Sequence, residues 1–319
     1  MARRRERHPR RQRPRARAAV QGKGVIMAPG DLITRPGQVQ YGELLLGAGT
    51  PYLWRGITGW EDLPALDSGT VPRSDAHGAF PGGLLAQART IGLDGLIIRA
   101  PRASVGAVVG ALNAGTVPVE DERPFVAWLD DRGPLLAYAR ATRRAVPASL
   151  GYRLGTITGG ALEFVATDPR RYELTERAAS AALPMSEPGL SWPLTWPLNF
   201  GTPGSTGALT AVNAGDAATH PVFEFRGPVT RPALTNLNTG DVIEYDIPLA
   251  AGDMLTVDTL PGTVTLNGTA SRIYTATSRS APEQTFTLAP GTTNLIFRAA
   301  PGSNDPTASA TVRYRSAYW

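Results

Sequence analysis

The 319-residue chain contains no cysteine, a single lysine (Lys23) and only three histidines. The lack of cysteine excludes disulfides, cysteine-ligated zinc or iron–sulfur centres, and thiol nucleophiles. No apolar run approaches the ~18–20 residues that a helix needs to cross a bilayer, so we expect no membrane insertion. The basic residues at the N-terminus are not followed by an apolar segment, and we therefore expect no secretory signal.

Motifs that carry chemistry are also missing. The chain has no Gly-x-Ser-x-Gly nucleophile elbow, no P-loop and no Gly-x-Gly-x-x-Gly that opens a helix. His8, His77 and His220 share no spacing that would bind a metal from one helix. The sequence therefore predicts no catalytic residue, no metal site and no cofactor.

Acidic residues cluster without the pattern of a reaction centre. Glu61–Asp62, Glu120–Glu122 and Asp130–Asp131 are neighbours within loops, where adjacent carboxylates point apart. A glycan hydrolase needs two carboxylates that converge to about 5–9.5 Å, and that alternative is disfavoured but left open. Three further acids lack the compact spacing of a calcium loop and are interpreted as surface residues: Asp246, Asp253 and Asp258.

The net charge of +5 has an uneven origin. Residues 1–23 hold nine arginines, Lys23 and one acid, Glu6, a net charge of +9, so the rest of the chain carries −4. Residues 1–26 are predicted to be a disordered Arg-rich arm, because like charges repel and little can be buried. Met27 resembles a natural N-terminus, and we interpret the arm as a non-native extension from an upstream start codon. The alternative is that Arg3–Arg5 and Arg10–Arg17 contact RNA, DNA or an acidic partner. A mildly acidic body argues against a nucleic-acid-binding globule.

The body has the composition of a turn-rich β protein, with 35 glycines and 28 prolines. Residues 27–182 are expected to be short strands with one helix at Ser104–Asn113, where apolar residues recur at three and four. Residues 61–83 are expected to be a long loop. Further expectations are a strand–turn–strand at Thr90–Arg99 around Asp94–Gly95, a hairpin turn at Asp130–Gly133, and a short helix at 176–182.

Residues 183–207 differ in character, with five prolines and four glycines. Proline at these positions forbids a central strand, so this Pro/Gly/Trp-rich segment is predicted to be a linker. Trp192 and Trp196 lie in a repeated Trp-Pro-Leu unit. We expect their rings to anchor the linker on a domain or a neighbouring subunit, and the alternative is that they stack on sugar rings.

Residues 208–319 alternate between apolar and polar positions. Ile243, Tyr245 and Ile247 fall on one face, and Leu255 and Val257 repeat the pattern. A period of two indicates strands with one buried face. Turns are expected at 251–253, 267–268 and 290–291, and the Asn-Gly of the second is the strongest hairpin signal in the chain. This half is therefore predicted to be an antiparallel β-sandwich.

Several blocks, in this order and spacing, resemble the siphovirus-type phage distal tail proteins, a family of tail-tip and baseplate hub adaptors. The resemblance covers roughly residues 31–319. In the first half it is carried by Ala166-Thr167-Asp168-Pro169-Arg170-Arg171-Tyr172. In the second half it is carried by Asn213-Ala214-Gly215-Asp216-Ala217, Pro221–Pro228 with its Gly227-Pro228, Leu249–Thr259 with Gly252 and Asp258, Val264-Thr265-Leu266-Asn267-Gly268, Asn294–Phe297 and Tyr314–Tyr318. The Arg-rich arm departs from the family pattern.

The resemblance implies a mainly β fold. Residues 27–182 would form a ring-forming N-terminal split β-barrel domain with one helix and a long hairpin, and 208–319 a galectin-like antiparallel β-sandwich. The motif residues would have structural roles: Asp168, Pro169, Arg170, Tyr172, Gly227, Pro228, Gly252, Asp258, Asn267 and Gly268.

The resemblance also implies a structural, non-enzymatic role. Six copies would form a ring at the virion tail tip, assembled in the host cytoplasm, that joins the tail tube to the tail-tip hub and the host-recognition apparatus. Its partners would be copies of itself, the tail tube protein and the hub protein, with receptor-binding and tape-measure proteins as further candidates. DNA would only pass through the lumen. The alternative is a carbohydrate-binding tail module that attaches to the host cell wall.

Overall fold

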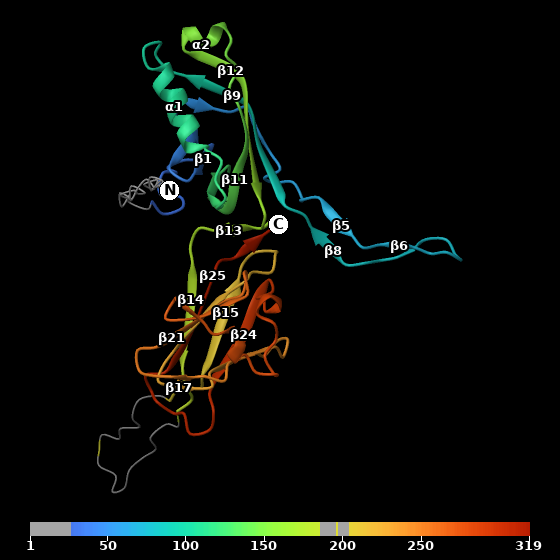
Figure 1. The fold of residues 1–319 in the computed structure, drawn as a ribbon, viewed down its shortest axis with the longest axis vertical. Coiled ribbons are helices and arrows are strands. Elements are labelled where there is room, and N and C mark those ends of the chain that lie inside the picture. The colour runs from blue at the N-terminus through green and yellow to red at the C-terminus, as the bar shows by residue number, and fades with distance from the viewer. Residues whose placement is uncertain (1–26, 186–195, 197–203) are drawn as a thin grey trace, which may run out of the picture.

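The computed structural model describes residues 27–185, 196 and 204–319, so the predicted Arg-rich arm and most of the predicted linker lie outside them. The chain builds two β-rich domains that follow one another along its long axis, with a hairpin projecting to one side (Figure 1). No helix in the described part of the chain is long and apolar enough to span a bilayer.

The first domain is one strongly curved sheet in the order β2-β1-β10-β11-β12-β9-β3, with β4 beside β9 and β13 beside β11. The two end strands, β2 and β3, approach each other without pairing, so the sheet forms a nearly closed barrel. Its strands are β1 (Gln38–Tyr41), β2 (Leu44–Gly47), β3 (Tyr52–Leu53), β4 (Gly56–Thr58), β9 (Arg89–Arg99), β10 (Arg123–Trp128), β11 (Leu135–Ala145), β12 (Thr156–Ala166) and β13 (Arg171–Glu173).

Two helices accompany the barrel, α1 (Val105–Gly115) and α2 (Leu150–Leu154). The helix predicted at 104–113 is confirmed, although the Ser104 hydroxyl donates to the carbonyl of Pro101 and does not cap the helix. The turn predicted at 130–133 is also confirmed, because it joins β10 to β11. Val109 and Leu112 of α1 join the barrel core.

Two predictions for this domain are wrong. Residues 90–99 form no hairpin but one continuous strand, β9. Gly95 adopts φ +62° where the register with β12 shifts, so it accommodates a bulge and not a chain reversal. Residues 61–83 are not a simple loop, because β5 (Leu66–Ser68) pairs with β8 (Leu84–Ala86) and β6 (Val71–Pro72) pairs with β7 (Ala79–Phe80).

The second domain is a sandwich of antiparallel sheets, as predicted, with a core drawn from both. One sheet has the order β14-β25-β16-β21-β22-β23, and the other β15-β24-β18-β19. The strands are β14 (Arg177–Ala182), β15 (Ala208–Asn213), β16 (Val222–Arg226), β18 (Ala233–Asn236), β19 (Val242–Glu244), β21 (Met254–Asp258), β22 (Thr263–Leu266), β23 (Ala270–Ser271), β24 (Gly291–Arg298) and β25 (Ser309–Tyr314). A small pair, β17 (Val229–Thr230) with β20 (Pro248–Leu249), and two short 3-10 helices, Ile273–Thr275 and Glu283–Thr285, complete it.

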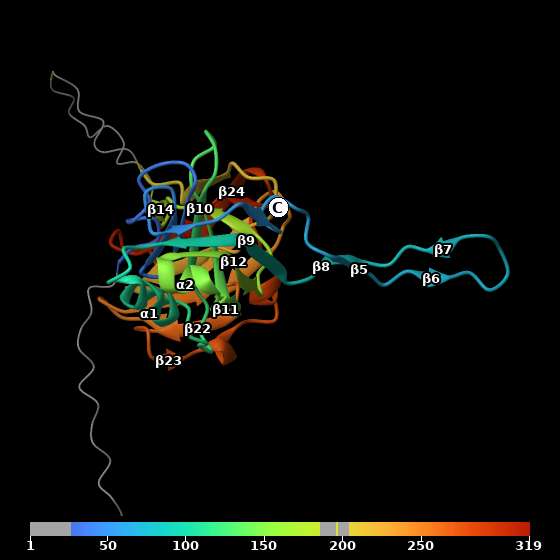
Figure 2. The same cartoon turned by 90° about the horizontal axis from the view of Figure 1, so that it is seen from above.

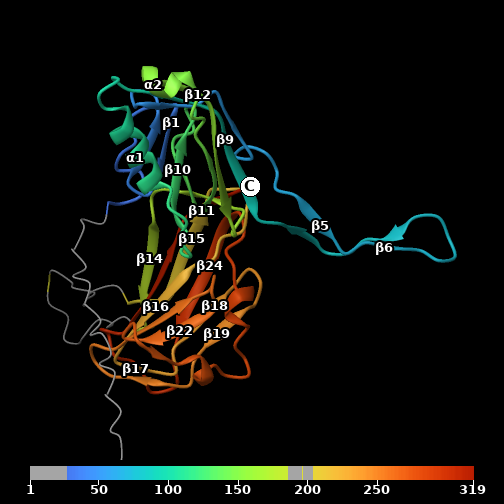
Figure 3. The same cartoon turned by 45° about the horizontal axis from the view of Figure 1, so that its top comes forward.

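The short helix expected at 176–182 is wrong, because this segment is strand β14, paired along its length with β25. Local sequence does not reveal this partner, which follows about 130 residues later in the chain. The sandwich therefore recruits 177–182 from the segment that was expected to end the first domain. In return the last strand, β26 (Ala317–Tyr318), pairs with β13 of the first domain, while Ala317 also bridges to Ala217 of the sandwich. Figure 3 shows β14 and the C-terminus at this crossing.

The barrel core provides a test of the first domain's packing. Phe164 is fully buried, with its ring centroid 4.7 Å from that of Tyr41 and 5.1 Å from that of Phe125. Phe164→Ala is expected to lower the free energy of unfolding of this domain by about 3–5 kcal/mol, measured by denaturant titration. The control Val212→Ala, at an exposed position, should change it by less than about 0.5 kcal/mol. Equal effects of the two substitutions would contradict the assigned core.

Candidate functional site at the domain junction

The loop from β12 to β13 places three of the predicted motif residues in one network. The Arg170 guanidinium lies 2.7 Å from Asp168 Oδ1, and the Tyr172 hydroxyl donates to Asp168 Oδ2 at 2.5 Å. Arg170 also donates to the carbonyl of Ala218 in the sandwich at 3.0 Å. Burial, followed by the negative charge of Asp168, raises the pKa of Tyr172, which therefore stays a neutral donor. The network joins the two domains.

Arg89, at the start of β9, organises the base of the projecting hairpin. Its guanidinium donates to the carbonyls of Gly59 (2.7 Å), Trp60 (3.0 Å) and Asp62 (2.7 Å). It also donates to the carbonyl of Pro169, the fourth motif residue of this loop, at 2.7 Å. Burial and the nearby Arg171 charge lower the pKa of Arg89 to about 10, so the side chain remains charged at neutral pH.

Arg171 adds the chain's last residues to the same structure. It pairs with Glu61 at 2.8 Å, lies 5.7 Å from the Trp60 ring and donates to the carbonyl of Trp319. Around it, Tyr172 and Ala317 pack with three other buried residues in a small apolar core between the domains. The hairpin base, the junction loop and the C-terminal strand are therefore held by one set of contacts.

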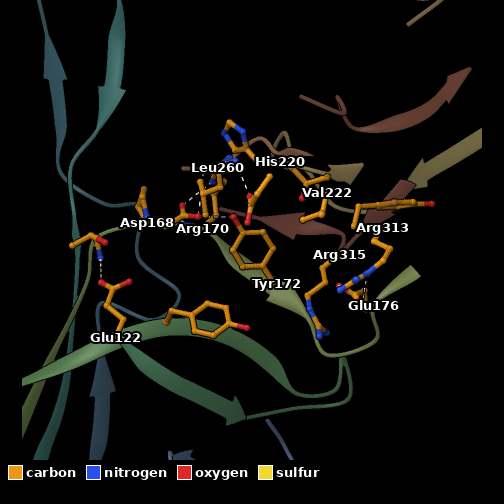
Figure 4. A pocket seen from close by; sticks show the side chains of 16 residues that line it. Glu122, Asp168, Arg170, Tyr172, Glu176, His220, Val222, Leu260, Arg313 and Arg315 are labelled. Carbon is orange, nitrogen blue, oxygen red and sulfur yellow. Dashed lines mark hydrogen bonds and ion pairs between the residues drawn. The ribbon is translucent and has the colours of Figure 1, made fainter. Parts of the chain in front are cut away.

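Beside this network lies an open cleft of about 560 Å³ between the domains (Figure 4). Its charged side chains are largely neutralised by one another, since Asp168 pairs with Arg170 and Glu176 pairs with Arg313 at 3.2 Å. Burial, followed by the charge of Arg170, lowers the pKa of His220. Across the described residues, no group of three or more potential ligands is arranged to hold a metal ion. The arrangement is that of a polar domain interface.

Asp258 differs from its interpretation as a surface residue. It lies at the end of β21 and lines the cleft, and burial raises the pKa of its carboxyl group. Strand periodicity could not reveal this, because residues of both domains line the cleft.

The other predicted motif residues gather at turns of the sandwich. Gly227 and Pro228, joined by a cis peptide bond, follow β16, and the amide of Gly227 donates to the carbonyl of Asp253 at 3.0 Å. Asn267 and Gly268 form the turn from β22 to β23 with φ +52° and +73°, as expected for an Asn-Gly hairpin. Gly252 lies in the neighbouring turn, where the next residue, Asp253, accepts from Asn267 Nδ2 at 3.0 Å. The structure thus separates the motif residues into a junction group and a turn group.

Of the two candidate contact residues of the linker, the structure describes only one. Trp196 is described and is 85% exposed, whereas Trp192 lies outside the described residues. The roles of Arg89, Glu61 and Arg171 at the junction were not predicted from the sequence. One signal was available, because Arg89 is in phase with Ile91 and Leu93, the inward positions of β9. A charged residue at a buried strand position needs several partners.

Arg89 is expected to be essential for the hairpin base. Arg89→Met keeps much of the apolar volume but leaves four carbonyls without their donor. Each unpaired buried group costs about 1–3 kcal/mol, so thermal or denaturant unfolding should show a loss of at least about 3 kcal/mol. Arg143→Met, at an exposed position of β11, is the matched control and should change stability by less than about 0.5 kcal/mol. A wild-type unfolding curve for Arg89→Met would refute the assigned role.

Comparison with known proteins agrees with this architecture. Residues 214–318 match the family described as the siphovirus-type tail component, C-terminal domain. No curated protein matches the chain. Among solved structures, the chain is similar to SPP1 Dit (gp 19.1), described as a paradigm of the hub adsorption apparatus in phages that infect Gram-positive bacteria. The identity is 14%, the TM-score is 0.61, and the match covers 88% of this chain and 99% of that one.

The chain also matches a protein of the phage P2 baseplate, solved in its activated conformation with Ca, at 12% identity and a TM-score of 0.48 over 86% of this chain and 96% of that one. The resemblance recognised in the sequence blocks is confirmed for the second domain by the family match and for the fold by SPP1 Dit. Residues 214–318 therefore match the siphovirus-type tail component C-terminal domain family, and the chain that carries them has the fold of a phage distal tail protein.

Proposed function

We propose that this protein is a structural adaptor of a phage tail tip, in which six copies form a ring that joins the tail tube to the tail-tip hub and its host-recognition parts. The observation that carries the proposal is the family match of residues 214–318, in a chain whose fold matches SPP1 Dit over almost its whole length. Both similarities are to structural components of tails, which supports a non-enzymatic role.

The first domain has the surface of a protein that assembles. Its hairpin leaves the barrel without a covering layer (Figure 2) and exposes several large apolar side chains. Exposed apolar surface of this kind marks a site of contact with another protein. A closed ring supplies that contact and stabilises a chain that has no disulfides by mass action.

The charge of the body supports a place around a DNA channel. Excluding residues 1–23, the chain carries a net charge of −4. Attraction to phosphate would slow DNA passing through a ring, and a mildly acidic protein avoids it. Neighbours in the tail would then be the tube protein on one side and the hub protein on the other, with receptor-binding and tape-measure proteins as further partners.

The ring can be tested by measuring the mass of the purified protein. A ring of six copies should have six times the 33.8 kDa of one chain, and negative-stain images should show six-fold rings. The mass should be measured over a range of concentrations, because assembly follows mass action. A monomer at the highest concentration reached would oppose the proposal.

A second candidate function is attachment to cell-wall carbohydrate, supported by the exposure of Trp196. An exposed indole ring can stack on a sugar ring. Pull-down of the whole chain with host cell walls, compared with Trp196→Ala, tests this. The full chain is needed for this test. A fragment of residues 206–319 would lack β14, an edge strand of the sandwich that lies earlier in the sequence. Binding that falls at least tenfold in the variant would support the carbohydrate function, and equal binding would oppose it.

A further inference from the structure

The projecting hairpin (residues 63–88) is the most exposed apolar element of the described chain. Its only charged residues are Asp67, Arg73 and Asp75. Near its tip, the Arg73 guanidinium lies 4.8 Å from the centre of the Phe80 ring. Large apolar side chains along it are 41–70% exposed: Leu63, Leu66, Val71, Phe80, Leu84 and Leu85.

A hairpin of this kind gains little stability from its own contacts. A two-stranded ribbon is marginally stable in water without a third strand or a covering layer. Each strand of the projecting hairpin pairs only with its partner, so both outer edges are left open. Open edges and apolar side chains together favour docking on another protein surface.

A receptive surface lies on the other flank of the same domain. A groove of about 580 Å³, here called the α1 groove, runs between the C-terminal half of α1 and the β1–β2 turn. Leu44, Ala111 and Ala114 provide its apolar lining, and Glu43 and Arg123 its charges. The outward positions of α1 are Gly106, Ala107, Gly110, Ala111 and Ala114, so that helix shows solvent no charged side chain. Helices that are apolar on all sides are normally buried.

The two surfaces complement each other in charge and position. The hairpin tip carries Arg73 and Asp75, and the α1 groove carries Glu43 and Arg123, one charge of each sign on either surface. In Figures 1 and 2 the hairpin and α1 lie on opposite flanks of the first domain. Two different complementary patches on opposite flanks produce head-to-tail contacts, which form a ring when the rotation between successive copies closes.

We propose that the projecting hairpin of one copy docks in the α1 groove of the next copy, with the Phe80 side chain over Ala111. This inference rests on the proposed ring and identifies the surfaces that make it. The partner of both surfaces is a second copy of this chain.

The absence of native cysteine allows a direct test. Phe80 and Ala111 are both exposed in one copy, so Phe80→Cys with Ala111→Cys should leave the fold intact, as thermal unfolding under reducing conditions can verify. Mild oxidation of the assembled protein should give a ladder of disulfide-linked multimers on a non-reducing gel, which dithiothreitol removes. The control pairs Phe80→Cys with Leu237→Cys, an exposed position of the sandwich, and should give no ladder beyond dimers.

A charge exchange provides a second readout. Glu43→Arg and Arg73→Glu each place like charges at positions 43 and 73 of the docked surfaces. Each should therefore raise the protein concentration at which half of the chains are assembled by at least tenfold, and the double variant should reverse most of that increase. Rings with neither a ladder nor recovery would overturn the docking while leaving the ring proposal intact. If the wild type forms no rings at all, that result contradicts the proposed function itself.

Discussion

The arrangement of the molecule depends on how the buried charge of Arg89 is satisfied. A guanidinium removed from water must find acceptors in a fixed geometry, and here four backbone carbonyls accept from Nε and Nη1, while Nη2 has no hydrogen-bond partner among the described residues. Three of these carbonyls belong to the segment that enters the hairpin, and the fourth belongs to the junction loop. The direction in which the hairpin leaves the barrel is thereby linked to the loop that carries the sandwich. A rigid direction is what a projecting element needs if it must meet a second surface at a defined place.

The charged side chains of the cleft make structural contacts. Its acids and arginines hold one another and the neighbouring backbone, so few are free to act on a ligand. Tyr172 is kept protonated by burial and by Asp168, which suits a permanent donor better than an acid–base catalyst. The raised pKa of Tyr172 thus has its cause in the contacts that join the two domains.

The sequence predicted a strand or helix correctly where the spacing of apolar residues within that element determines its conformation. The alternation in residues 208–319 predicted strands with one buried face, and the spacing around Val109 and Leu112 predicted α1. It failed where the partner is distant, as in β14, whose alanines carry little preference and whose conformation is set by pairing with β25. It also failed at Gly95, because a glycine after an aspartate has the same signature in a bulge as in a turn. Asp258 shows the same limit, since it lines a cleft together with residues of the other domain.

The crossing of β26 into the first domain has a consequence for biosynthesis. β13 receives its outer neighbour only when Ala317 and Tyr318 have been made, so the first domain remains incomplete throughout translation of the second. A chain interrupted before these residues lacks both that strand and the Trp319 carbonyl that Arg171 contacts. The edge of the first domain's sheet at β13 is thus completed by residues that follow the whole of the second domain in the sequence.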